Sequence, residues 1–129
     1  MKRDLDLVRE ILLWMEAQPE GRNCNTWEFD IPGRSEKDIG YHAYLMHQAG
    51  LIIAYDTTSM SDDAPSWAPL MLTWGGHEFI DAAKDNGIWE KAKKNIIGPA
   101  ASVSFTLLLE WLKEEGKRRL GISGAGSSS

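Results

Sequence analysis

Apolar residues recur at helical spacing in five stretches of the chain. The first predicts a helix over residues 4–17 with Asp4 as its N-cap. The second predicts a helix over residues 36–49, with Ser35 as its N-cap and Gly50 as a left-handed C-cap. The remaining three predict a helix that starts at Thr73, a short helix over residues 88–96, and a last helix that carries Phe105, Leu108, Leu109 and Leu112.

Alternating and short apolar runs predict three strands. Residues 26–31 alternate as a half-buried strand would, and residues 51–55 and 70–73 flank a polar segment rich in turn residues. The last two runs therefore predict a β-hairpin with a long tip. We expect an α+β chain with one domain over residues 1–121 and a disordered Gly/Ser tail over residues 122–129.

The order of these elements is that of a winged helix-turn-helix domain, with the hairpin as a long-tipped wing and additional C-terminal helices. The chain between the first two helices holds a strand and a turn, and it is too short for the usual extra helix. This departure puts ordinary docking in the major groove of DNA in doubt.

Charge weakens the DNA-binding hypothesis further. The chain has 14 Lys and Arg against 19 Asp and Glu, and no basic residue lies between Asp38 and Ala83, where the second helix and the wing would meet phosphates. A DNA-binding transcriptional regulator that uses flanking basic segments stays open as an alternative. Its candidate contacts are Lys2, Arg3, Arg34 and Lys37.

Four segments of the sequence carry a family resemblance, and they read MKRDLDLVREILL, YHAYLMHQAGLI, LTWGGHEFIDAAKD and VSFTLLLEWLK. Together they resemble a domain-of-unknown-function family of small bacterial and prophage proteins that open with MKRD, over roughly residues 1–121. The resemblance implies a winged-helix-like fold and a bacterial or phage origin. It implies no activity and no catalytic residues.

The residues themselves favour a protein that is not an enzyme. A single cysteine, Cys24, excludes an internal disulfide and a multi-cysteine zinc site, and His42 and His47 are five residues apart and so do not share a helix face. No phosphate-binding or nucleophile-elbow motif is present, and we expect neither a cofactor nor a metal. No secretory or membrane-spanning segment is found, which predicts a cytoplasmic protein without membrane contact.

Binding residues are the remaining candidates. Trp67 lies among turn residues with Asp62 and Asp63, and with Tyr41 and Tyr44 it predicts a protein-binding surface with an acidic rim that selects a basic partner. The alternative is that Trp67 folds back onto its own hairpin. A protein-binding regulator, adaptor or inhibitor of unknown partner is therefore the predicted function.

The last helix predicts a second surface. It is more apolar than one contact face requires, which predicts a homodimer whose interface includes Leu108, Trp111 and Leu112.

Overall fold

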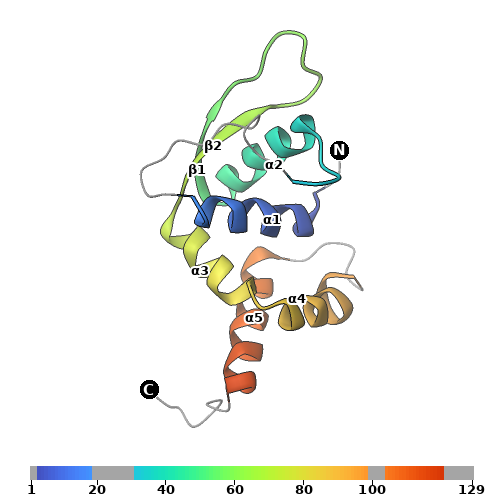
Figure 1. Ribbon diagram of the computed structural model, residues 1–129, viewed down its shortest axis with the longest axis vertical. Coiled ribbons are helices and arrows are strands. Elements are labelled where there is room, and N and C mark those ends of the chain that lie inside the picture. The colour runs from blue at the N-terminus through green and yellow to red at the C-terminus, as the bar shows by residue number, and fades with distance from the viewer. Residues whose placement is uncertain (1–2, 19–30, 99–103, 121–129) are drawn as a thin grey trace. The chain divides into compact units, whose positions relative to one another are not determined.

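The structure is a computed structural model that describes residues 3–18, 31–98 and 104–120 (Figure 1). The α+β class is confirmed, because the described residues form five α-helices, one π-helix and a two-stranded antiparallel sheet. The predicted strand over residues 26–31, Ile31 excepted, and the predicted tail lie outside the described residues. The elements are α1 (Leu5–Glu16), α2 (Glu36–Gln48), β1 (Ile52–Asp56), β2 (Trp67–Leu72), α3 (Trp74–Ala83), α4 (Asn86–Ala92), η2 (Lys93–Ile97) and α5 (Phe105–Leu120).

The chain divides into two compact units, Met1–Ile80 and Asp81–Ser129, with the boundary inside α3. The first unit has six Lys and Arg against thirteen Asp and Glu, whereas the second has eight against six. The first unit therefore carries the acidic character of the protein. The single-domain organisation stays a prediction.

Local capping signals set the predicted helix starts. The Asp4 carboxylate accepts from the N–H groups of Asp6 and Leu7, and the Ser35 hydroxyl accepts from the N–H of Asp38 at 3.1 Å. Gly50 has a φ of 80°, which is the left-handed conformation predicted for it after α2. Helices α1 and α2 therefore begin and end within a residue of the predicted positions. The short helix predicted over residues 88–96 is instead α4, which ends at Ala92, followed by the π-helix η2.

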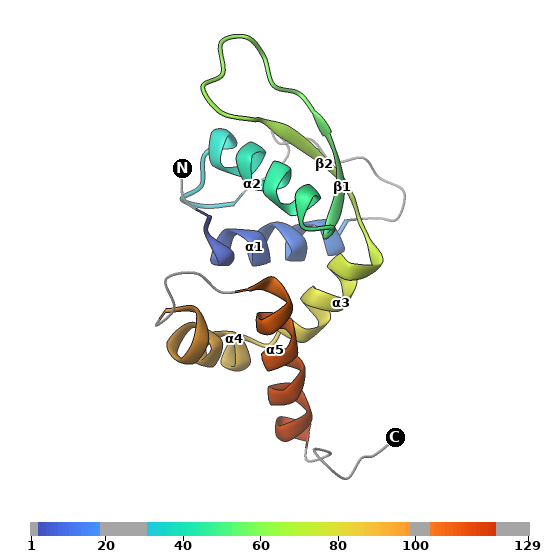
Figure 2. The same cartoon turned by 180° about the vertical axis from the view of Figure 1, so that it is seen from behind.

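In the first unit, α2 packs against one side of the hairpin, whose tip extends past the N-terminal end of α2 (Figures 1 and 2). Gly40 permits this approach, because a Cβ at that position would lie 2.5 Å from the Ser66 hydroxyl oxygen. On β1, Ile52 and Ala54 are buried and Ile53 and Tyr55 are exposed. The inner face of the sheet therefore forms core with the buried side of α2.

The second strand starts three residues earlier than predicted, so Trp67 is its first residue and does not lie in the tip. The register shifts between Ile53 and Ala54, and Ala54 pairs with Pro69. Ala54 donates its N–H to His47 Nδ1 at 3.3 Å. A proline, which has no N–H to donate, is therefore tolerated at this irregularity in the strand pairing.

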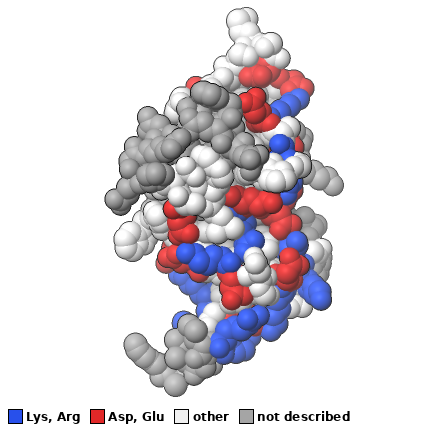
Figure 3. Space-filling model, viewed as in Figure 1, with Lys and Arg blue, Asp and Glu red and all other residues white. Residues whose placement is uncertain are grey.

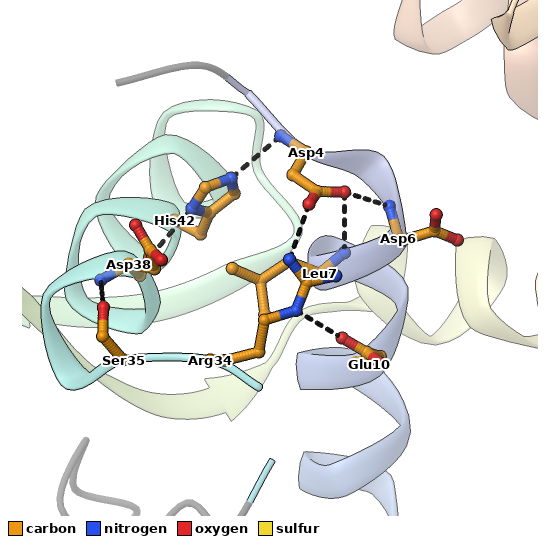
Figure 4. A network of polar contacts seen from close by, with 8 residues as sticks. All are labelled: Asp4, Asp6, Leu7, Glu10, Arg34, Ser35, Asp38 and His42. Atoms are coloured by element: carbon orange, nitrogen blue, oxygen red, sulfur yellow. Dashed lines mark hydrogen bonds and ion pairs between the residues drawn. The ribbon is translucent and has the colours of Figure 1, made fainter. Parts of the chain in front are cut away.

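Polar contacts join the start of α1 to the start of α2 (Figure 4). Arg34 donates to Asp4 at 2.7 Å and to Glu10 at 3.1 Å. His42 is buried; its Nε2 accepts from the Asp4 N–H at 2.9 Å, and its Nδ1 donates to the Asp38 carbonyl at 2.8 Å. These contacts fix the orientation of α2 relative to α1.

In the second unit, two exposed basic side chains pair with one buried carboxylate. Glu115 is 3% exposed, and it receives Lys91 at 2.6 Å and Arg118 at 2.7 Å. The hydrogen bond from Lys91, aided by the positive charges of Lys91 and Arg118, lowers the pKa of Glu115 below its ordinary value although burial opposes this. Trp89 and Leu112 form part of the buried core of this unit.

Candidate interaction surface

Four rings from α2 and β2 form a continuous surface, which we call the aromatic row: Tyr41, Tyr44, His47 and Trp67. The ring centres of Tyr41 and Tyr44 are 6.1 Å apart, those of Tyr44 and Trp67 are 5.6 Å apart, and those of His47 and Trp67 are 5.1 Å apart. The two tyrosines and the tryptophan are half-buried, and His47 is exposed. Three of the five predicted protein-binding residues therefore come together in the structure.

Trp67 does not fold back onto its own hairpin in this arrangement, because its ring lies against Tyr44 and His47 of α2. His47 is the member of the row that sequence analysis missed. It lies three residues after Tyr44, and this spacing on one helix face is the signal that could have included it. Its Nδ1 also accepts a hydrogen bond from the Ala54 N–H of β1, so His47 has a structural role as well.

The acidic tip consists of Asp56, Asp62 and Asp63, at the outer end of the hairpin. Figure 3 shows acidic side chains gathered there. Asp63 forms an ion pair with Lys37 of α2 at 2.7 Å, and Asp62 accepts from the Ser59 N–H at 2.8 Å. A hollow of about 430 Å³ lies between this tip and the first turn of α2 and is lined by Glu36, Lys37 and residues 61–66. Asp62 and Asp63 of the acidic tip therefore line an open polar recess beside α2.

Hydrogen bonding and charge favour the ionised forms of Asp56 and Asp63. The hydrogen bond from Lys37 and its positive charge lower the pKa of Asp63, and the same contact raises the pKa of Lys37. Hydrogen bonds from Thr58 lower the pKa of Asp56. Asp56 and Asp63 are therefore negatively charged at neutral pH and in mild acid.

The predicted phosphate-binding residues do not form a free basic patch. Arg34 is held by Asp4 and Glu10, and Lys37 is held by Asp63. Arg3 is exposed, and Lys2 lies outside the described residues. Among the described residues of the first unit, these pairings leave little unneutralised positive charge for DNA.

Basic side chains of the second unit gather over α4 and α5 in Figure 3. At least six of its eight Lys and Arg lie within 4.0 Å of a carboxylate. Most of this positive charge is therefore balanced locally, as on a solvated helix face.

The predicted dimer interface needs correction in part. Leu108 and Leu112 are fully buried within the chain, so they cannot form an exposed interface. Both lie on the inner side of α5, where apolar side chains at i and i+4 share one helix face. Trp111 is half-buried, and Leu107 beside it is 56% exposed. The homodimer itself stays a prediction.

No arrangement typical of a metal centre occurs in the described part of the chain. Residues 3–18, 31–98 and 104–120 contain no group of three His, Cys, Asp or Glu side chains that could hold a metal ion. Gly75 and Gly76 lie in the first turn of α3, and Gly76 packs against the backbone of Leu51. No helix within these residues is long and apolar enough to cross a membrane.

Comparison with known proteins identifies the family. Residues 2–102 match the family described as hypothetical protein (DUF2513). A Haemophilus influenzae protein (strain Rd) with the name "Uncharacterized protein" is 35% identical over 114 residues, which are 88% of this chain and 91% of the relative. No solved structure matches the chain.

The fold and the surface define a small α+β protein built on a helix and a β-hairpin. The chain belongs to the DUF2513 family. The predicted resemblance to a bacterial family of unknown function is confirmed. The prophage origin, the MKRD opening of the family and the winged-helix character stay predictions.

Proposed function

We propose that the chain is a non-enzymatic, winged-helix-like binding module that recognises a basic segment of a partner protein. The aromatic row and the acidic tip would form the binding surface. One observation carries the proposal: the aromatic row meets the acidic tip where Trp67 pairs with Asp56 across the hairpin, and the sequence has no Lys or Arg from Asp38 to Ala83. A regulator, adaptor or inhibitor of bacterial or prophage origin is the role that fits such a surface.

The chemistry of the surface favours an arginine-containing partner. Half-buried Tyr and Trp rings supply contact area with little loss of side-chain entropy, and their faces attract cations. At the acidic tip, an incoming arginine can bind the Asp63 carboxylate through two parallel hydrogen bonds, which a lysine cannot do. Lys37, which holds Asp63 in the free protein, would then be displaced.

The order of the elements supports the winged-helix-like part of the proposal. Helices α1 and α2 precede a hairpin, and α3 follows the second strand directly. The pairing of Arg34 and Lys37 with carboxylates argues against DNA as the partner.

Titration of a labelled random duplex at about 50 mM and about 200 mM salt is expected to show no binding. Binding that collapses at the higher salt would restore the DNA-binding alternative.

Opposite charge changes at the acidic tip are expected to alter peptide binding in opposite directions. The probe is a fluorescein-labelled peptide of alternating arginine and proline, followed by anisotropy with the full chain. Asp62→Lys combined with Asp63→Lys is expected to weaken binding by about tenfold or more. Lys37→Ala is expected to strengthen it, because Asp63 then has no internal partner to exchange.

The matched control reverses two acidic residues of the second unit, Glu90→Lys with Glu110→Lys, and so changes the net charge equally. This control is expected to leave the affinity close to that of the unmodified chain. Equal weakening by both double variants would mean that the peptide responds only to net charge. That result, or a Lys37→Ala variant with weakened binding, would contradict the proposal.

A further inference from the structure

One buried ionisable side chain has no part in the proposed binding surface. His42 is among the buried residues of α2 and is 2% exposed. Both of its ring nitrogens form hydrogen bonds, one with the Asp4 N–H at 2.9 Å and one with the Asp38 carbonyl at 2.8 Å (Figure 4). Histidine is the side chain whose charge ordinarily changes between about pH 5 and pH 8. A buried histidine that joins the N-cap residue of α1 to α2 is therefore a candidate for a pH-sensitive contact.

The two partners of His42 fix the protonation state of its ring. A backbone N–H can only donate, so Nε2 must accept from Asp4 and carries no proton. A backbone carbonyl can only accept, so Nδ1 must carry the one proton of the ring and donate it to Asp38. The folded structure therefore holds a neutral ring in a single tautomer. A proton added at Nε2 would turn this acceptor into a donor that faces another donor.

The charged groups on the α1 side of the ring balance one another. Asp4 and, beyond it, Glu10 both pair with Arg34, and Arg3 directly before Asp4 is exposed (Figure 4). The Asp4 carboxylate already accepts from Arg34 and from two N–H groups in the first turn of α1. An imidazolium that turned to this carboxylate would compete with three donors. The hydrogen bonds of the ring therefore decide which of its forms the fold holds.

The other elements beside the ring add few ionisable groups. On α2, Asp38 lies four residues before His42 and presents its carbonyl, and the Tyr41 ring stands edge-on to the His42 ring with the ring centres 5.8 Å apart. Strand β2 has no ionisable side chain, and those of β1, Tyr55 and Asp56, are exposed. Because Tyr41 belongs to the aromatic row, a change at His42 would reach the end of that row.

We propose that His42 is a pH-sensitive latch between the start of α1 and α2. The neutral ring holds the Asp4 backbone at neutral pH, and protonation in mild acid releases it. The closed latch cannot bind a proton at Nε2 whereas the open latch can, so the closed fraction falls as the pH falls. The pairing of Asp4 with Arg34 would still join the two helices after release. This inference does not rest on the function proposed for the aromatic row and the acidic tip.

The first test follows the unmodified full chain by nitrogen NMR from about pH 7.5 to about pH 5. At the higher pH we expect the ring proton of His42 on Nδ1. As the pH falls, we expect the His42 ring signals and the Asp4 amide signal to move together with one midpoint, while the signals of α4 stay in place. A proton on Nε2 at the start, a ring that stays neutral throughout, or a ring that titrates without moving the Asp4 amide would each overturn the inference. Loss of the whole spectrum before the ring titrates would overturn it too.

The second test compares urea unfolding at about pH 7.5 and about pH 5.5 for three proteins. In His42→Gln the amide oxygen can accept from the Asp4 N–H but binds no proton, and His77→Gln, which replaces an exposed histidine of α3, is the matched control. Between the two pH values, the unfolding equilibrium constant of the unmodified chain and of the control is expected to rise about five- to tenfold more than that of His42→Gln. His47 is present in all three proteins, so its titration cancels. Equal changes in all three proteins would overturn the inference.

Discussion

Alanine in place of Gly76 is expected to destabilise the protein by about 2 kcal/mol or more, whereas alanine in place of Gly116 is expected to stabilise it. Both glycines lie inside helices, where alanine is favoured by about 1 kcal/mol. At Gly76, however, the added Cβ would overlap the carbonyl oxygen of Leu51. That carbonyl accepts from the Thr73 N–H at 3.0 Å and is therefore held in place. Overpacking against fixed backbone costs more than the helix propensity gains.

Gly116 supplies the matched control, because no atom lies within 4 Å of a Cβ built at that position of α5. Gly116→Ala is therefore expected to gain about 0.5–1 kcal/mol. The free energy of unfolding of each variant is measured by urea titration followed by circular dichroism. A Gly76→Ala protein as stable as the unmodified chain would contradict the close packing of α3 against Leu51.

Short-range features of the fold could be predicted from the sequence because their causes are local. An N-cap acts on backbone groups two or three residues away, so Asp4 and Ser35 could be identified as the starts of α1 and α2. Gly50 ends α2 by its own backbone conformation. The ion pair between Asp4 and Arg34 could not be predicted, because it joins residues thirty positions apart.

The candidate surface was predictable only in part, because it also joins residues that are far apart in the sequence. Tyr41 and Tyr44 share a helix face by their spacing, but the position of Trp67 beside them depends on the register of β2. The exposure of Ile53 and Tyr55 on the outer face of β1 was hidden because residues 51–55 are apolar at every position. Such a run predicts a strand without indicating which face is buried.

The largest expected effect at the junction of α1 and α2 comes from Asp4. Its carboxylate caps α1 through the N–H groups of Asp6 and Leu7 and pairs with Arg34. Asp4→Ala removes both roles and is expected to lower the free energy of unfolding by about 2–3 kcal/mol. Asp4→Asn keeps a capping oxygen but loses the charge that Arg34 binds, so we expect about half of that loss. Urea titration of both variants at neutral pH separates the cap from the ion pair.

The dependence of stability on acid pH provides an independent check that the charge of Asp4 stabilises the fold. Burial raises the pKa of Asp4, but the hydrogen bond from Arg34, the backbone N–H groups of Leu7 and Asp6 and the charge of Arg34 outweigh it and hold the pKa below its ordinary value of 3.8. A carboxylate with a lowered pKa in the folded state contributes stability that is complete above its ordinary value and is lost as the pH falls through the folded value.

The stability difference between the unmodified chain and Asp4→Asn is therefore expected to be constant from neutral pH down to about pH 5 and to shrink below about pH 4. Asp56, Asp63 and Glu115 also have lowered pKa values, but they are present in both proteins and cancel in the difference. A difference that persists unchanged through acid would mean that Asp4 acts by its shape alone. In that case Arg34 would be held by Glu10. The orientation of α2, which carries three rings of the aromatic row, would then depend on the Asp4 N-cap and on the hydrogen bond between His42 and the Asp4 N–H.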